Sequence, residues 1–276
     1  MSMAARCWWA RPSDSFRWVL AASLVGLFFG PAVPTMRATD AAVSANQEKA
    51  RQVLAATIQA LGGRAWLDLH TQRSKGKTAA FFQGNPTGAL AETTETTVLP
   101  YKQRIDFAPK GRVVQIYVAH RGWEITYKGK KDIAPQQMET YLRWRDHSLG
   151  VALRRWFADP STVLIDDGQT LIERRLVDKV TLINRNNEAI TLEVDIQTHL
   201  PVRLSFEWRD PKFHDKNLDV VEYDNYQIVD GIATPYTTTR MHNGETVRQR
   251  YVTRMEYNVA VRKDLFNPDL VAEHLH

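Results

Sequence analysis

The stretch AITLEVDIQTHLPVRLSFEWR, residues 189–209, decides the fold. Apolar side chains recur in it at every second position, with Ile190 and Leu192 before a short turn and Leu204 and Phe206 after it. Because successive side chains of a β-strand point to opposite faces, this period predicts two strands, each with one apolar and one polar face. Such strands are typical of an antiparallel sheet that packs one face on a core and leaves the other in water.

The same period of two continues on both sides of this stretch. Asn243-Gly244 is the strongest turn signal, because both residue types accept the positive φ angles of a type I′ hairpin. Asp166-Asp167 before Gly168 is interpreted as another turn. The predicted strands cover residues 74–82, 90–98, 102–108, 112–119, 122–128, 162–166, 169–176, 179–185, 188–197, 201–209, 219–229, 234–242 and 245–258.

The last strand is expected to separate apolar from polar side chains. Strict alternation places Tyr251 and Met255 on its apolar side, and Arg248, Arg250 and Arg254 on its wet side. A sheet this wide with a continuous apolar face has to curl around its own helices or around a ligand.

Two helices complete the pattern. Residues 47–61 place apolar side chains at helical spacing, and a Gly-Gly pair ends this helix. A second helix is expected over 135–157, where an Asp-Pro pair stops it. Long strands, short turns and two substantial helices predict an α+β protein, with a large antiparallel sheet and helices packed on it.

The N-terminus has the order of a secretory signal. Three arginines precede an apolar run at residues 18–30. This run is shorter than the about 20 residues that a membrane-spanning helix needs. Small residues follow, and we expect cleavage after Ala41, with Ala38 and Ala45 as alternatives.

Cleavage there gives a signal peptide at 1–41 and a single domain at 42–276. The mature chain then has no cysteine, because Cys7 lies in the leader, and this excludes disulfides and a thiol nucleophile. Its 32 basic and 29 acidic side chains are dispersed, whereas nucleic-acid binding needs basic residues gathered on one face. We therefore expect a periplasmic protein without a nucleic-acid partner. Anchoring in the inner membrane by an uncleaved signal is the alternative.

Motifs for catalysis are absent from the sequence. It has no G-x-S-x-G, no H-E-x-x-H and no phosphate-binding glycine loop. Its eight histidines lack metal-ligand spacing, and Asp210 and Asp215 lack the partners of a calcium or glycosidase site. The sequence thus predicts a protein that is not an enzyme and has no metal or cofactor. A hydrolase with a dispersed site is one alternative.

Aromatic and aliphatic side chains gather on the predicted sheet and on helix 135–157, which we expect to face each other. An ordinary filled core is the simpler interpretation of each such residue. Together they are consistent with a hydrophobic cavity between sheet and helix. The predicted cavity wall consists of Met138, Tyr141, Leu142, Leu149, Leu153, Trp156, Leu192, Val194, Leu204, Phe206, Tyr251 and Met255.

Four segments carry the turn and packing signatures of one known family. The first is a D-x-x-T-x-L-P-x-R pattern, matched by Asp195, Thr198, Leu200, Pro201 and Arg203. The others are A-L-G-G followed by S-K-G-K-T after the first helix, D-G-I-A-T-P at 230–235, and D-L-F-N-P at 264–268. In these segments, which span nearly the whole mature chain, the sequence resembles the LolA-like superfamily of lipoprotein carriers.

The resemblance implies a half-open β-barrel, a curved sheet with helices on its concave face and a cavity for the acyl chains of lipoproteins or other lipids. It implies lipid binding and transport in outer-membrane biogenesis, with envelope membrane proteins as further candidate partners. True carriers are shorter than this chain, so a related lipid-binding role in the envelope is an equal alternative to lipoprotein transfer. The rival from another class is a non-catalytic envelope assembly or scaffold protein with a filled core.

Overall fold

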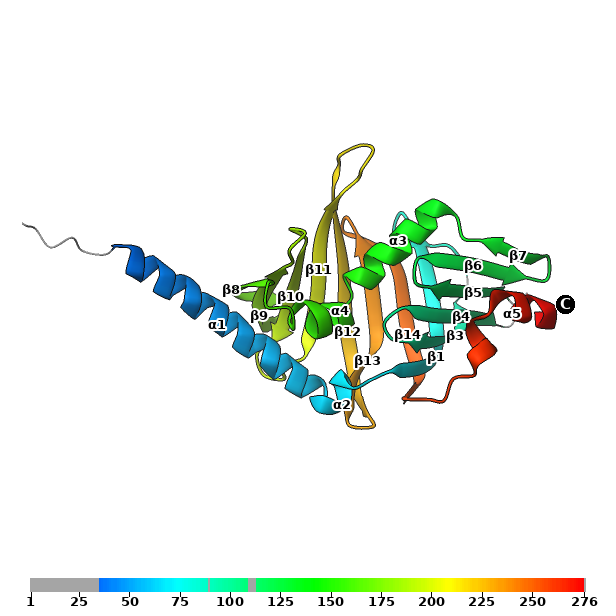
Figure 1. The fold of residues 1–276 in the computed structure, drawn as a ribbon, viewed down its shortest axis with the longest axis horizontal. Helices are drawn as coiled ribbons and strands as arrows, with labels where there is room; N and C mark the ends of the chain where they lie inside the picture. The colour runs from blue at the N-terminus through cyan, green and yellow to red at the C-terminus, as the bar shows by residue number, and fades with distance from the viewer. Residues whose placement is uncertain (1–34, 89, 109–112, 276) are drawn as a thin grey trace, which may run out of the picture.

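The computed structural model describes residues 35–88, 90–108 and 113–275. Its helices are α1 (Thr35–Leu61), α2 (Arg64–Leu67), α3 (Pro135–Asp146), α4 (Leu149–Val151) and α5 (Pro268–Leu275), with a π-helical segment η1 (Ala152–Trp156) and a 3₁₀ turn η2 (Lys263–Phe266). Its strands are β1 (Thr71–Phe82), β2 (Asn85–Pro86), β3 (Ala91–Val98), β4 (Lys102–Ala108), β5 (Val113–Val118), β6 (Arg121–Thr126), β7 (Gly129–Asp132), β8 (Val163–Ile172), β9 (Arg175–Ile183), β10 (Ala189–Asp195), β11 (Pro201–Arg209), β12 (Lys216–Val229), β13 (Ile232–His242) and β14 (Glu245–Tyr257). One antiparallel sheet of 14 strands contains all of these strands (Figure 1).

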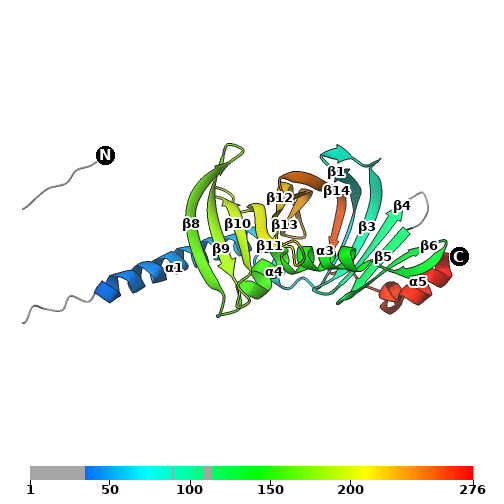
Figure 2. The ribbon, with the colours of Figure 1, turned by 90° about the horizontal axis from the view of Figure 1, so that it is seen from above.

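The order of the strands makes the chain cross the sheet once. The order is β7-β6-β5-β4-β3-β1-β14-β13-β12-β11-β10-β9-β8, with β2 paired to β1. Two meanders therefore meet where β1 pairs with β14. The chain leaves the sheet at the edge strand β7 and returns at the opposite edge strand β8. The intervening α3, α4 and η1 make the crossing, over a sheet that is curved and open (Figure 2).

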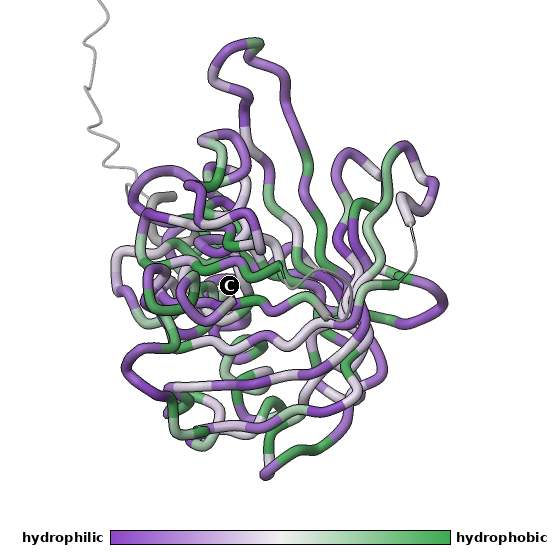
Figure 3. Tube along the Cα trace, turned by 90° about the vertical axis from the view of Figure 1, so that its right-hand side faces the viewer, coloured by the Kyte–Doolittle hydropathy of each residue, from purple (hydrophilic) through white to green (hydrophobic). Residues whose placement is uncertain are grey.

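The predicted α+β layout, with a large antiparallel sheet and packed helices, is confirmed. Hydrophobic and hydrophilic residues alternate along the strands (Figure 3). The predicted hairpin turn has positive φ at both central residues, 50° at Asn243 and 83° at Gly244. The side chain of Asn243 also accepts a hydrogen bond from the Leu218 N–H at 2.9 Å, which ties the turn to β12.

The first predicted helix lies within α1, which begins before it. Its apolar stripe, which includes Leu54, Ile58 and Leu61, is buried on β8, β9 and β13. The helix ends where the Gly63 N–H donates to the Ile58 carbonyl oxygen at 2.8 Å, with positive φ at Gly63. This is the glycine stop that the sequence indicates. The predicted signal peptide falls mostly on residues 1–34, which lie outside the described residues.

The predicted boundaries between 162 and 185 were wrong. The predicted strand 169–176 contains the turn between β8 and β9, at Glu173 and Arg174, whose φ angles are 46° and 69°. The segment Asp166 to Gly168 is a bulge within β8, where the register with β9 shifts, and not a turn between strands. Residues other than glycine rarely take positive φ, so the sequence carries little signal for the true turn.

The second predicted helix is interrupted. α3 ends at Asp146, Ser148 is extended with φ −73° and ψ 158°, and the chain continues as α4 and η1. His147 stacks on Phe206 of β11, with ring centroids 4.4 Å apart. This contact fixes the end of α3 on the sheet before the chain turns toward the core.

Two bulges in β14 change the faces predicted for that strand. Register shifts occur beside Val247 and again beside Thr253. Each bulge adds one residue and reverses the alternation beyond it. Arg248 and Arg250 therefore share one face with Met255, and Tyr251 points to the opposite face.

Gly76 is placed where β1 meets the second of these bulges. A Cβ atom on Gly76 would lie 2.3 Å from the carbonyl oxygen of Tyr251, a backbone atom. We expect Gly76→Ala to lower the free energy of unfolding by about 1–3 kcal/mol, as for an overpacked interior. Urea denaturation measures this change. Gly150→Ala is the matched control, because its Cβ meets no atom within 4 Å, and it should stabilise α4 by up to about 1 kcal/mol. Equal stability of the two variants would contradict the close approach.

Candidate ligand-binding face

One face of the sheet carries both α1 and the α3–η1 segment, and we call it the inner face. Directly paired residues of antiparallel strands point to the same face. Leu204 of β11 pairs with Val221 of β12, Val221 pairs with Arg240 of β13, and Arg240 pairs with Arg248 of β14. These side chains therefore all point to the inner face. The inner face is apolar over β8–β11 and polar over β13, β14, β1 and β3.

The apolar half is packed with the protein's own side chains. Leu54 and Ile58 of α1 belong to the same buried cluster as Leu153 of η1 and the side chains of β8–β11. Leu153 is 1% exposed. Seven residues of the predicted cavity wall lie in or against this cluster: Leu149, Leu153, Trp156, Leu192, Val194, Leu204 and Phe206.

Three further residues of the predicted wall lie on α3 and contact the other meander. Met138 is buried beside Tyr117 of β5, and Tyr141 and Leu142 pack against the same small cluster. The rings of Tyr141 and Tyr117 stack with centroids 3.8 Å apart and an interplanar angle of 12°. Burial raises the pKa of Tyr117 to about 12, so its hydroxyl is protonated at neutral pH.

The structure separates the last two predicted wall residues. Met255 is half-buried and pairs with Ser74 on the inner face. Tyr251 pairs with Lys77 and is 40% exposed on the outer face. The assignment of Tyr251 to the apolar side was wrong, because the bulge at Thr253 reverses the faces between these two residues.

The polar half contains a cluster of three arginines, Arg240, Arg248 and Arg250, around the carboxylate of Glu95. Arg248 Nη2 donates to Glu95 Oε1 at 2.8 Å, and Arg250 also donates to this oxygen. Arg250 Nη2 donates to the Ser74 hydroxyl at 2.8 Å. We call Arg240, Arg248, Arg250 and Glu95 the arginine cluster. The cluster carries two more positive charges than negative ones.

Arg240 has the least favourable surroundings in the arginine cluster. It pairs directly across β13 and β14 with Arg248, and opposed like charges are destabilising. Its guanidinium lies 4.9 Å from the ring centroid of Trp144 on α3. Burial, and then the charge of Arg248, lower the pKa of Arg240 to about 10. Even so, Arg240 is charged at neutral pH.

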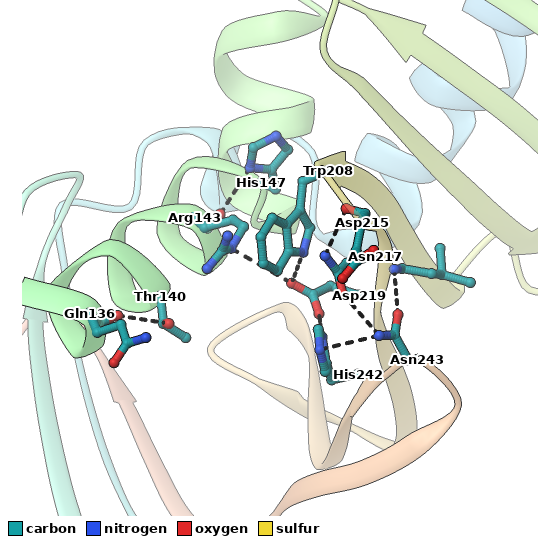
Figure 4. Close-up of polar contacts among 11 residues, drawn as sticks. Gln136, Thr140, Arg143, His147, Trp208, Asp215, Asn217, Asp219, His242 and Asn243 are labelled. Atoms are coloured by element: carbon teal, nitrogen blue, oxygen red, sulfur yellow. Dashed lines mark hydrogen bonds and ion pairs between the residues drawn. The ribbon is translucent and has the colours of Figure 1, made fainter. Parts of the chain in front are cut away.

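A polar network fixes α3 to the sheet at the end near β11 (Figure 4). Asp219 of β12 is 2% exposed and accepts a hydrogen bond from Trp208 Nε1 at 3.0 Å. Its second oxygen lies 2.7 Å from His242 Nδ1. Arg143 of α3 lies over the Trp208 ring, 3.3 Å from the centroid, with its Nε 3.9 Å from Asp219. These contacts add charge and aromatic stacking to the apolar contacts that Met138 and Trp144 of α3 make with the sheet.

A separate pocket of about 620 Å³ opens beside α4 and η1. Trp156 is the predicted wall residue that lines it, together with Arg145, Arg155 and Tyr101. Both arginines lie near the Tyr101 ring, with guanidinium carbons 5.5 and 5.9 Å from its centroid. Asp146, Asp159 and Glu188 also line the pocket, so its surface is aromatic with charges of both signs.

In the part of the chain that the structure describes, no three or more His, Cys, Asp and Glu side chains are placed to hold a metal ion. Among the described helices, none combines the length and the apolar composition needed to span a bilayer.

Solved structures share this fold at low sequence identity. A DUF1329 family protein from Desulfovibrio piger is similar with a TM-score of 0.56 at 10% identity, over 80% of this chain and 97% of that chain. A domain from Vibrio parahaemolyticus, described as an outer membrane lipoprotein-sorting protein, gives 0.51 at 11% identity, over 83% of this chain and 99% of that chain. This chain has a LolA-like fold. A LolA superfamily protein from Nitrosomonas europaea aligns over 83% of this chain and 98% of its own, with 13% identity and a TM-score of 0.47.

Sequence comparisons give no match, either with protein-family models or with curated proteins. The motifs that indicated the LolA-like fold are nevertheless explained by their contacts. The Asp195 carboxylate accepts hydrogen bonds from the N–H groups of Gln197 and Thr198 and from the Thr198 hydroxyl. Arg203 Nη2 donates to Glu222 at 2.7 Å. The D-x-x-T-x-L-P-x-R pattern is thus a turn closed by its own side chains and followed by a cross-strand ion pair.

The arginine cluster is what sequence reasoning missed. Strict alternation put Arg248 and Arg250 on the wet side, and neither Arg240 nor Glu95 was predicted as a site residue. A signal exists in the sequence: Arg240 in the next-to-last strand and Arg248 and Arg250 in the last strand flank one hairpin turn at Asn243-Gly244. Hairpin register brings Arg240 opposite Val247, next to Arg248, and the bulge at Val247 then shifts the pairing to Arg248.

The ionised Glu95 carboxylate is expected to stabilise the polar half. Burial acts to raise the pKa of Glu95, but Arg250, Arg248 and Arg240 outweigh it and hold the pKa below its ordinary value of 4.5. A lowered folded-state pKa means that this stabilisation is present above the unfolded-state pKa and is lost as the pH falls through the folded-state pKa.

We therefore expect Glu95→Gln to lower the free energy of unfolding at pH 7 by about 1–3 kcal/mol, the range for a lost hydrogen bond to a charged group. The difference from the unaltered protein should shrink below about pH 4.5. Urea denaturation between about pH 3 and 7 measures both changes. Glu256→Gln, which removes an outer-face carboxylate paired with Arg254, should cost under about 1 kcal/mol. A Glu95→Gln effect that is independent of pH would contradict the assignment.

Proposed function

We propose that this protein binds an amphipathic, acyl-bearing ligand, the acyl chain of a lipoprotein or another lipid, on the inner face beneath α3. It acts as a carrier or sensor in the bacterial periplasm and not as an enzyme. The observation that carries the proposal is the division of the inner face. α3 lies over a surface that is apolar on one side and cationic on the other, which is the chemistry of a lipid with an acyl chain and a charged head.

α3 has the properties of a movable cover. Its buried side chains are Met138 and Trp144, and its other contacts with the sheet come from long side chains such as Tyr141 and Arg143. The extended Ser148 separates it from η1, where Leu153 is fully packed. Elements with few buried apolar contacts open at low free-energy cost. We infer that α3 moves while η1 stays in the core.

The acyl chain would lie between α3 and the neighbouring strands. Met138, Tyr141 and Leu142 of the predicted cavity wall would line the α3 side, and Phe206, which Trp144 of α3 contacts, would line the sheet side. Each buried methylene contributes about 0.8 kcal/mol. A chain of ordinary length therefore offsets the loss of the contacts that α3 makes with the sheet.

Other observations support this role without deciding it. One solved structure with this fold is described as a lipoprotein-sorting protein, but a shared fold does not fix function. The order of arginines and apolar residues at the N-terminus favours export. We include in the proposal a single domain at 42–276, released into the periplasm after cleavage near Ala41.

One observation favours the rival role as an envelope assembly or scaffold protein. Leu153, Leu192 and Leu204 are fully buried against each other and against α1, as expected of a filled core. This packing fills the apolar half under α1 and η1. The carrier and scaffold roles therefore differ in what they predict for the region under α3.

A charge placed on α3 tests the two roles. We expect Leu142→Asp to weaken binding of a fluorescent acyl probe by about tenfold or more, because tenfold corresponds to only about 1.4 kcal/mol and an unpaired charge beside an acyl chain costs more than that. The melting temperature should fall only slightly, because α3 contributes little to global stability. Probe fluorescence and thermal unfolding are measured on the same samples, together with mass spectrometry of lipids extracted from the purified protein.

Two variants serve as controls. Leu270→Asp makes the same change on α5, where the side chain is 37% exposed, and it should leave probe binding unchanged. Leu153→Asp buries the charge in the main cluster and should unfold much of the protein. Absence of both extracted lipid and probe binding in the unaltered protein would contradict the proposed function, and unfolding of Leu142→Asp would favour the filled-core rival.

A further inference from the structure

We propose that the arginine cluster recognises the phosphate-bearing, anionic head of the ligand. This inference rests on the proposed function, since it names the head-group chemistry of the amphipathic ligand held beneath α3. It assigns a role to charges that folding alone leaves poorly compensated.

The charge of the cluster is unbalanced. In the described part of the chain, Glu95 is the carboxylate with atoms within 4 Å of the guanidinium groups of Arg248 and Arg250, and no carboxylate lies that close to Arg240. A partly buried charge is costly unless it is paired. A ligand with about two negative charges, such as a phosphate monoester, would neutralise the excess.

Arg240 is the residue whose partner is missing. Among the described residues, its guanidinium makes no hydrogen bond or ion pair, whereas Arg250 is held by Ser74, Thr93 and Glu95. Arg240 lies against the Trp144 ring, which orients a guanidinium but accepts no N–H. Its planar fork of donors is suited to two phosphate oxygens at once.

The site is accessible and lies beside the proposed acyl site. The side chain of Arg248 is 28% exposed, and Arg240 is half-buried, so solvent reaches both. Trp144, which contacts Arg240, also makes an edge contact with Phe206 of the apolar half, with ring centroids 5.3 Å apart. Head and acyl chain would therefore lie on the two sides of Trp144, under the same helix.

A purely structural role explains less of this arrangement. Arg250 has that role, because it is buried and bonds to β1 and β3. Arg240 and Arg248 face each other across a strand pair. Their repulsion is unfavourable in the empty protein and becomes an advantage when an anion lies between them.

The experiment compares two lipids with identical acyl chains, phosphatidic acid and phosphatidylcholine, in binding to the full protein. We expect the unaltered protein to bind phosphatidic acid about tenfold more tightly or better, the effect of one charge-assisted hydrogen bond. Arg240→Gln should bring the two affinities close together and leave phosphatidylcholine binding unchanged. Its melting temperature should stay level or rise, because the variant removes an uncompensated charge.

Arg254→Gln is the matched control. Arg254 is in the same strand as Arg248 and Arg250, but its side chain is on the outer face and 66% exposed. This variant should keep the full preference for phosphatidic acid. Equal binding of both lipids by the unaltered protein would overturn the inference, and so would an equal loss of preference in Arg240→Gln and Arg254→Gln, which would indicate only the net charge of the protein.

Inorganic phosphate distinguishes the possible sources of the anion. We expect it to compete weakly with phosphatidic acid, because it lacks the acyl chains; competition at equal affinity would assign the site to a free anion and overturn the lipid source. If neither lipid binds but phosphate raises the melting temperature of the unaltered protein and not of Arg240→Gln, the anion site stands and the proposed lipid-binding function fails. If neither lipid nor phosphate binds, both fail.

Discussion

The path of the chain between β7 and β8 is the constraint on which the rest of the structure depends. These strands form the two opposite edges of one sheet, and they are consecutive in the sequence. The connection between them has to cross the whole sheet, and it does so over the inner face as α3, α4 and η1. A segment required by topology thus becomes the cover of the surface where we place the ligand.

The two halves of the inner face of this wide sheet are stabilised in different ways. Over β8–β11, α1 and η1 fill the apolar side with leucine, valine and tryptophan, and this region is the largest hydrophobic cluster of the described residues. Over β13, β14, β1 and β3, the same face holds arginine, glutamate, serine and threonine, which depend on hydrogen bonds for their stability. α3 lies across both regions and buries two of its side chains, Trp144 in the main apolar cluster and Met138 beside Tyr117. The unequal covering separates a stable part of the molecule from a part that can open.

The arginine cluster has an energetic cost that its own contacts do not offset in full. Glu95 compensates one charge, and the pKa of Arg240 is lowered by its burial and by Arg248. Groups with perturbed pKa values often mark functional sites, although structural ion pairs perturb pKa values too. Here the two cases are separable, because Arg250 has hydrogen-bond and ion-pair partners, whereas Arg240 has neither among the described residues.

Much of the fold followed from local sequence patterns. The alternation around Leu192 and Leu204, the glycine stop after Leu61 and the turn at Asn243-Gly244 depend on interactions within a few residues, and the structure has all three. The bulges beside Val247 and Thr253 depend on how β14 fits between β13 and β1. No local pattern reports that fit, and each bulge reverses the faces beyond it.

For the candidate site too, local patterns were predictable from the sequence and contacts between distant strands were not. The apolar residues of β10, β11 and the second helix were predicted on the covered face, where they lie. The arginines of β14 were placed on the wrong face for the reason just given, and the break at His147 was missed because it depends on stacking against Phe206, far away in the sequence. What local patterns could not supply was the pairing of distant strands.

Movement of α3 away from the inner face when lipid binds is the central claim, and a distance between spin labels tests it most directly. The labels are placed at Glu139 of α3 and Glu207 of β11, which are both exposed, as cysteine variants in a Cys7→Ser background. Pulsed electron paramagnetic resonance then gives the distribution of distances with and without phosphatidic acid. Our account predicts a longer and broader distribution in the presence of the lipid. An unchanged distribution under conditions where the lipid is bound would contradict it.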